Sequence, residues 1–108
     1  MIHVIAYVKM KPDMIPKALE CYRVLLPQVF AVEKGCLEYS PTIDFDIGAV
    51  NQNKDANMIV VHERWAAIED FKAHLNMPHS AQFRASIKDF LEERITVTIT
   101  QDALAAAL

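Results

Sequence analysis

Three of the four histidines and the single tryptophan lie close together in the sequence, between residues 62 and 84. The set consists of the run His62-Glu63-Arg64-Trp65, followed by His74, His79 and Arg84. Histidine exchanges a proton near neutral pH, and arginine pairs with anions through a permanent charge. These residue types indicate acid–base chemistry on a small molecule, with His74, His79 and Arg84 as the candidate catalytic residues.

Each of these residues also has a structural explanation, and the sequence alone leaves both open. Trp65 can fill the core and leave its N–H to find a partner. His74 and His79 can be structural histidines or helix caps. Arg84 can pair with a carboxylate such as Glu63.

The spacing of the potential ligands does not favour a metal or a cofactor. His74 and His79 are five residues apart with Pro78 between them, and the sequence contains no His-Glu-x-x-His motif. The two glycines cannot form a nucleotide-binding fingerprint, and the two cysteines are expected to be small buried thiols. We therefore expect no metal site and no cofactor.

The elements that must position these residues follow from hydrophobic periodicity. The pattern predicts strands over residues 2–10, 36–43, 58–65 and 91–100, and helices from residue 15 to Gly35, over 67–75 and from Pro78 onward. Pro27 is expected to kink the first helix or end it early, because proline removes a helical hydrogen bond. The order of elements predicts an α+β fold of the ferredoxin-like, split βαβ type. The polar segment 44–57 is predicted to be a loop, either a functional lid or a plain hairpin extension.

On these elements the candidate residues converge. Phe71 and His74 lie on the inward stripe of one helix, Arg84 borders the stripe of the next, and the third strand carries Trp65. We therefore predict a pocket between the sheet and the helices, lined by Trp65, Phe71, His74 and Arg84, with Tyr39 and His79 near its mouth.

Length and charge narrow the function classes. The 108 residues suit one domain, which we place at 1–102 with a C-terminal tail at 103–108. The net charge of −3, without a basic run, gives no footprint for nucleic acid or anionic lipid. No apolar stretch is long enough to span a bilayer and no leader is recognisable, so we expect a cytoplasmic protein with no membrane partner.

The third predicted strand indicates a subunit interface. Its run Met58-Ile59-Val60-Val61 is apolar without alternation, which is typical of a strand buried on both faces. Because the helices cover only one face, a second copy of the chain is the simplest cover for the other. The sequence therefore predicts a homodimer.

At the residues singled out above, the chain resembles the antibiotic biosynthesis monooxygenase (ABM) family. The resemblance rests on Glu63-x-Trp65, Phe71, His74, Pro78-His79 and Phe83. Gly35-Cys36 before the second strand and Tyr39-Ser40-Pro41 with Asp44 after it are similar to the bacterial quinol monooxygenase branch. The resemblance covers essentially the whole chain.

The resemblance implies a dimeric α+β barrel that oxidises electron-rich phenols or quinols with molecular oxygen, without metal or flavin. In the aromatic-polyketide branch an Asn, a Trp, a Tyr and an Arg hold the substrate. Here Trp65 and Arg84 match, whereas Val61 stands for the Asn and Phe71 for the Tyr. The haem-degrading branch has an Asn where this chain has Ala6, so haem degradation is not expected.

We therefore predict a cofactor-independent monooxygenase of a quinol or a related small phenol. A deprotonated phenol reacts with oxygen by itself, so the protein needs an apolar pocket, a base and a positive group. His74 or His79 is the candidate base, Arg84 the group that holds the oxyanion, and Trp65, Phe71 and Tyr39 the substrate-binding residues. Two alternatives remain: an isomerase of a small hydroxy-ketone or sugar signal, and a non-enzymatic dimeric binding module.

Overall fold

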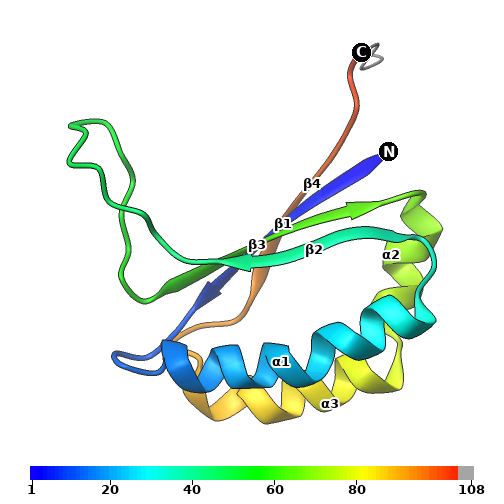
Figure 1. The fold of residues 1–108 in the computed structure, drawn as a ribbon, viewed down its shortest axis with the longest axis horizontal. Helices are drawn as coiled ribbons and strands as arrows, with labels where there is room; N and C mark the ends of the chain where they lie inside the picture. The colour runs from blue at the N-terminus through cyan, green and yellow to red at the C-terminus, as the bar shows by residue number, and fades with distance from the viewer. Residues whose placement is uncertain (105–108) are drawn as a thin grey trace.

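The computed structural model describes residues 1–104, which form a four-stranded antiparallel sheet and three α-helices (Figure 1). The elements in chain order are β1 (Ile2–Lys9), α1 (Ile15–Val32), β2 (Cys36–Thr42), β3 (Met58–Trp65), α2 (Ile68–Leu75), α3 (Pro78–Ile87), the short 3-10 helix η1 (Lys88–Phe90) and β4 (Thr96–Gln101). The strands lie in the order β2-β3-β1-β4. The predicted ferredoxin-like α+β fold is therefore confirmed.

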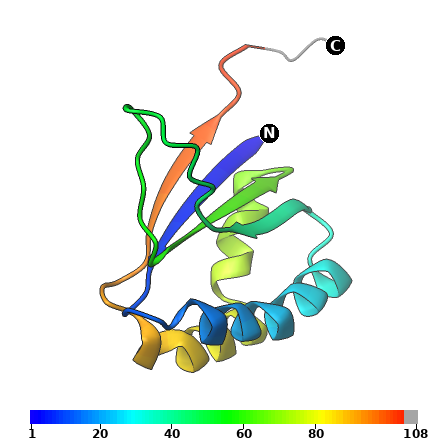
Figure 2. The ribbon, with the colours of Figure 1, turned by 60° about the vertical axis from the view of Figure 1, so that its left-hand side comes forward.

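The helices cover one face of the sheet, as Figure 2 shows from a second direction. Alternate residues of β1 and β3 are buried beneath them, at Val4, Ala6, Val8, Ile59, Val61, Glu63 and Trp65. The residues between them point to the other face, where Val60 is half-buried and Tyr7 and His62 are exposed. A single chain thus leaves one sheet face without a helical cover.

Helix α1 runs through Pro27 and ends at Val32, so of the two expected outcomes, a kink or an early end, the early end was wrong. The proline removes one hydrogen bond, but Leu25 and Val29 on either side of it are fully or almost fully buried. Packing of this face against the sheet compensates for the lost bond, because burial of such a side chain contributes about 1.5–3 kcal/mol.

The last strand is shorter than the sequence predicted. It begins at Thr96 rather than residue 91, because Lys88–Phe90 form η1 and Leu91 makes only an isolated bridge to Met10. Of the predicted tail at 103–108, residues 105–108 lie outside the described residues.

The connection between β2 and β3 is a loop without strands, and it projects away from the helices (Figure 1). Its apolar residues Phe45, Ile47 and Val50 are exposed.

Within residues 1–104, no helix is both long enough and apolar enough to cross a membrane.

Candidate active site

Glu33, His74 and His79 form a hydrogen-bonded cluster that water hardly reaches. The side chains are 4%, 8% and 7% exposed, respectively. The Nδ1 atom of His74 lies 2.9 Å from Oε2 of Glu33, and Nε2 of His79 lies 2.7 Å from the same oxygen. One carboxylate therefore joins two imidazoles that come from different helices.

The end of α1 places Glu33 in this cluster. Glu33 is the last residue of the helix turn, and its backbone N–H donates to Val29 O at 2.8 Å. Gly35 then lets the chain pass tightly over the start of α2: a Cβ atom there would lie 2.2 Å from the Asp70 carboxyl carbon. That carboxylate cannot easily move aside, because it accepts a hydrogen bond from the Ala67 N–H at 3.1 Å.

The cluster leaves one nitrogen of His74 free for chemistry. An ionised carboxylate only accepts hydrogen bonds, so His74 Nδ1–H and His79 Nε2–H are the donors to Glu33. Within residues 1–104, every fully buried side-chain polar atom has a hydrogen-bond partner. Nε2 of His74 has none, so this atom is not fully buried. Nε2 is therefore the ring nitrogen that is left to accept a proton, in the orientation that a carboxylate enforces on a catalytic histidine.

Aromatic rings fix the orientation of the His74 ring. The ring centroid lies 5.0 Å from that of Trp65, 5.6 Å from Tyr39 and 6.3 Å from Phe71. Ser80 adds a polar contact, with Oγ at 3.4 Å from Nδ1. His74 is thus held by packing as well as by hydrogen bonds.

Glu63 is a second buried carboxylate, 5% exposed, on the helix-covered face of β3. Its Oε1 accepts the indole N–H of Trp65 at 3.0 Å. Burial raises the pKa of Glu63 to about 7, and only the Trp65 hydrogen bond opposes this shift. Glu63 therefore changes its protonation state near neutral pH.

A cavity of about 490 Å³ opens between the sheet and the helices. Its walls are mainly apolar, and its polar or charged lining residues are Tyr22, Tyr39, Glu63, His74, Ser80, Arg84 and Arg94. Burial, followed by the nearby charge of Glu63, raises the pKa of Tyr39 well above its usual value. Tyr39 therefore keeps its proton and can donate a hydrogen bond to a ligand.

The structure brings four of the six predicted site residues to this cavity. Tyr39, Phe71, His74 and Arg84 line it. Trp65 does not: it is completely buried, and it packs behind the His74 ring. The loop at 44–57, which we considered as a lid, contributes no lining residue either.

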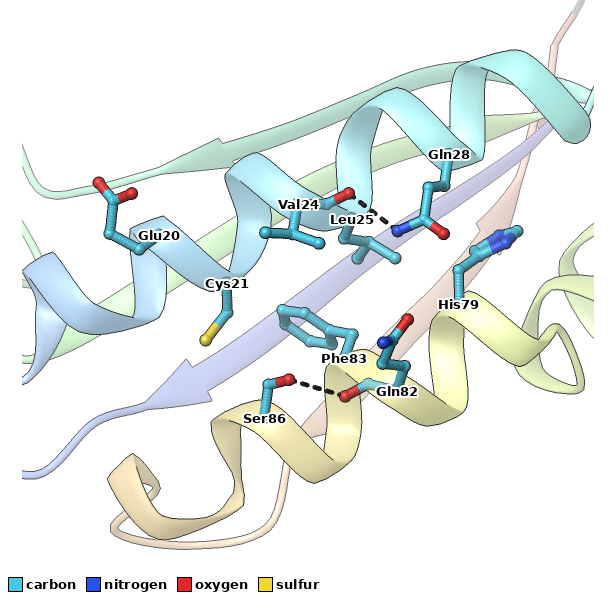
Figure 3. Close-up of a pocket in the computed structure, with 9 residues that line it drawn as sticks. All are labelled: Glu20, Cys21, Val24, Leu25, Gln28, His79, Gln82, Phe83 and Ser86. Atoms are coloured by element: carbon cyan, nitrogen blue, oxygen red, sulfur yellow. Dashed lines mark hydrogen bonds between the residues drawn. The ribbon is translucent and has the colours of Figure 1, made fainter.

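His79 faces the other way. It borders a groove between α1 and α3 that also contains Cys21 and Phe83 (Figure 3). His79 therefore does not lie at the cavity mouth, where it was predicted. It hydrogen-bonds Glu33 from the side of the groove. Between the two candidate bases, only His74 reaches the cavity.

Arg84 is exposed and does not pair with Glu63, whose hydrogen bond goes to Trp65 instead. It lies one helical turn after Ser80 on α3. Arg84 thus stands at the outer part of the cavity, away from the buried carboxylate.

The sequence analysis missed Glu33, although a signal was present. A negative charge near a helix C-terminus opposes the helix dipole, so it needs a compensating partner. Glu33, two residues before Gly35, is such a residue. Because side chains point alternately to the two faces of a strand, Glu63 shares the buried face with Trp65, which was reason to count it as a site residue.

Glu33, His74 and His79 also have the chemistry of metal ligands, with donor atoms all within 4.8 Å of one another. The histidine spacing and the missing His-Glu-x-x-His motif do not reveal this group, because its third donor, Glu33, comes from the end of α1. In the structure the shared Oε2 lies at hydrogen-bond distance from both nitrogens. The observed geometry fits a hydrogen-bonded cluster.

Comparison with known proteins identifies the family of this chain. The profile of the antibiotic biosynthesis monooxygenase family matches residues 1–86. The probable quinol monooxygenase YgiN of Escherichia coli is 31% identical over 100 residues, covering 90% of this chain and 95% of that protein.

Solved structures show the same fold. A crystal structure of an antibiotic biosynthesis monooxygenase has a TM-score of 0.78 at 25% identity, covering 96% of this chain and 100% of that one. Rv0793 from Mycobacterium tuberculosis has a TM-score of 0.78 at 21% identity, covering 98% of each chain. From the profile match and the 31% identical relative, the chain belongs to the antibiotic biosynthesis monooxygenase family.

Proposed function

We propose that this protein is a cofactor-independent monooxygenase that oxidises a quinol or a related small phenol with molecular oxygen. The observation that carries the proposal is His74 at the wall of an apolar cavity, with its Nδ1 held by buried Glu33. The quinol monooxygenase relative at 31% identity supports the substrate class.

The first step is removal of a phenolic proton by His74 Nε2. The imidazolium that forms stays close to the Glu33 carboxylate, which lowers the free energy of that charge. The resulting phenolate is electron-rich enough to reduce oxygen directly. The overall reaction balances as quinol plus oxygen giving hydroxyquinone plus water, so no external reductant is needed.

Other lining residues place the substrate. The Tyr39 hydroxyl and Glu63 are polar groups in an otherwise apolar wall, and each can hydrogen-bond a substrate oxygen. Phe71 supplies a ring surface. We propose that Arg84 attracts an anionic substrate, because its exposed position is removed from the oxygen that His74 would deprotonate.

Glu63 also favours the isomerase as a second candidate. Glu63, whose pKa burial raises to about 7, and His74 face one cavity, and an isomerase needs one group to remove a proton and another to return it. Such an enzyme would rearrange a hydroxy-ketone without consuming oxygen.

We further propose that the protein is a homodimer, as expected for a dimeric α+β barrel. The sheet face opposite the helices carries half-buried Ile5 and Val60 and exposed Tyr7. A second sheet would remove these side chains from water. A folded monomer in sedimentation at micromolar concentration would contradict this proposal. The cytoplasmic location expected from the sequence stays a prediction.

Oxygen uptake with reduced menadione tests the proposed function. We expect the protein to accelerate uptake above autoxidation, and His74→Ala to lower the rate by about two to four orders of magnitude. Lys72→Ala, an exposed change on the same helix, is the matched control. Full activity of His74→Ala would refute the assignment of the base. No acceleration by the wild-type protein would favour the isomerase or the binding module.

A further inference from the structure

Two arginines on the cavity wall have no carboxylate partner. Arg84 comes from α3 and Arg94 from the segment between η1 and β4, and both are exposed. Within residues 1–104, neither takes part in an ion pair, whereas Arg23 and Arg64 each pair with a glutamate. The protein carries a net charge of −3, so two unpaired positive charges at one cavity are not explained by its overall composition.

The two arginines lie toward one end of the cavity, and the acid–base residues lie toward the other. In the sheet register, Glu63 and Ile99 are both opposite Val4, whereas Thr96 is opposite Tyr7. Three residues of β1 separate these levels, roughly 10 Å at the rise of a strand, and Arg94 precedes Thr96 by two more residues.

Helix α3 repeats the same separation. Ser80, near its start, contacts His74, and Arg84 follows one turn later, about 6 Å along the axis. The helix runs from the side of α2 toward the connection that leads into β4 (Figure 1). Arg84 is thus displaced from His74 in the direction of Arg94.

The wall between the two ends is mainly apolar. It is formed by Val8 and Ala6 from β1, Phe83 from α3, and Ile95 and Val97 at β4. Tyr22, whose ring centroid lies 4.6 Å from that of Phe83, adds a single phenol to this part of the wall. A ligand that fills the cavity must therefore be largely apolar in its middle, with a hydroxyl at the end near Glu63 and His74. At the other end, a planar carboxylate is the group that guanidinium side chains bind most specifically.

Resting on the proposed function, we infer that the substrate is an aromatic acid. Its phenolic or quinol hydroxyl lies at His74, and its carboxylate, at the far end of the ring system, binds Arg84 and Arg94. This goes beyond a preference for quinols, because it assigns a second binding subsite and names its ligand chemistry.

Binding of unreactive naphthols tests the subsite without requiring oxygen chemistry. The probes are 6-hydroxy-2-naphthoate, with hydroxyl and carboxylate at opposite ends, 2-naphthol, without a carboxylate, and 3-hydroxy-2-naphthoate, with the two groups adjacent. Dissociation constants come from titrations of probe fluorescence at pH 7.5. We expect 6-hydroxy-2-naphthoate to bind about three- to tenfold more tightly than both other probes, since exposed charge pairs contribute modestly.

Variants locate the preference. The double variant Arg84→Gln with Arg94→Gln should lose it and keep the affinity for 2-naphthol, which also shows that the cavity remains intact. Lys88 is exposed, lies between Arg84 and Arg94 in the sequence and does not line the cavity. The control variant Lys88→Gln should therefore keep the preference for 6-hydroxy-2-naphthoate. Higher salt should weaken the preference of the wild-type protein for 6-hydroxy-2-naphthoate.

Three results would overturn the inference: equal binding of 6-hydroxy-2-naphthoate and 2-naphthol, a preference that survives the double variant, or no binding of any probe. The proposed function fails separately. A protein that prefers 6-hydroxy-2-naphthoate but does not accelerate oxygen uptake keeps the subsite and loses the monooxygenase. A protein that accelerates oxygen uptake but does not prefer 6-hydroxy-2-naphthoate keeps the monooxygenase and loses the subsite.

Discussion

Two glutamates, Glu33 at the end of α1 and Glu63 on β3, are buried to nearly the same degree, with 7% and 5% of the whole residue exposed. Their surroundings differ. Glu33 accepts hydrogen bonds from two imidazoles, whereas Glu63 accepts one from the Trp65 indole. The pKa of Glu63 is accordingly raised to about 7 by burial.

The difference shows that donors, and not depth alone, decide what a buried carboxylate does. Hydrogen bonds to two imidazoles hold the Glu33 carboxylate in a fixed position, from which it orients His74. One weak donor leaves Glu63 able to gain or lose a proton within the cavity. The two carboxylates therefore supply orientation and proton exchange, respectively, to the same site.

Removal of the charge at Glu33 should have the largest effect. In Glu33→Gln one amide oxygen can still accept from both imidazoles, but the imidazolium loses its counter-charge, and an amide NH2 replaces the second oxygen that lies 3.2 Å from His74 Nδ1. We expect turnover of reduced menadione to fall by roughly two or more orders of magnitude. Stability in urea should fall by about 1 kcal/mol, because hydrogen bonds to a neutral amide oxygen are weaker than those to a carboxylate.

Glu20→Gln is the matched control. Glu20 lies on the same helix but is exposed and pairs only with Arg23, so both activity and stability should be unchanged. If Glu33→Gln keeps wild-type turnover, Glu33 is a structural residue and the contrast with Glu63 has no functional meaning.

Glu63→Gln should make the protein more stable at neutral and alkaline pH. The folded pKa is about 7 and the unfolded value about 4.5, so between them the folded state binds more protons. Stability of the wild-type protein should therefore fall as the pH rises through this window. Relative to Glu63→Gln, we expect a loss on the order of 2 kcal/mol from pH 5 to pH 8.

Urea denaturation at several pH values measures this difference, with the exposed Glu69→Gln as the control. The comparison must be made between wild type and variant, since other groups also titrate in this range. Parallel pH profiles for wild type and Glu63→Gln would show that Glu63 is ionised in the folded protein.

Replacement of His79 should have a smaller effect on activity. His79→Leu removes one donor from Glu33 but leaves the cavity wall intact. We expect about a tenfold loss of turnover, with stability lower by about 1 kcal/mol. His79→Gln, which can still donate through its amide, should recover much of both. A loss as large as that of His74→Ala would make His79 the base.

Metal removal should have no effect. The carboxylate oxygen already lies at hydrogen-bond distance from both nitrogens, so we expect no stoichiometric metal by elemental analysis. Treatment with a chelator should leave the melting temperature and the turnover unchanged. The prediction fails if the wild-type protein contains one equivalent of metal and Glu33→Gln loses both the metal and the activity. In that case the three residues form a metal centre.

Much of the fold could be predicted because each element has a local signal. Residues Met58–Trp65 were predicted as a strand with both ends correct, since the run is apolar and bounded by polar residues. Pro78 marked the start of α3 for the reason that proline suits a first turn. The length of α1 was not predictable locally, because packing of Leu25 and Val29 outweighs Pro27.

The candidate site was only partly predictable. His74 and Phe71 were correctly placed at the cavity because helical spacing determines the inward stripe. The contact between Glu33 and the two histidines joins residues about forty positions apart, and no local pattern encodes it. Trp65 was placed on the correct face, but its side chain fills the core behind His74.

The position of β1 in the middle of the sheet has a consequence for folding. This first strand pairs with β4, where Val4 is opposite Ile99 and Ala6 is opposite Val97. Such pairing gives a high contact order, which slows folding because a long stretch of chain must be ordered first. Since Val97 and Ile99 also line the cavity, the binding site is completed only when β4 docks. An intermediate without β4 would thus contain the base cluster but not the closed pocket, and it could acquire structure before it acquires ligand affinity.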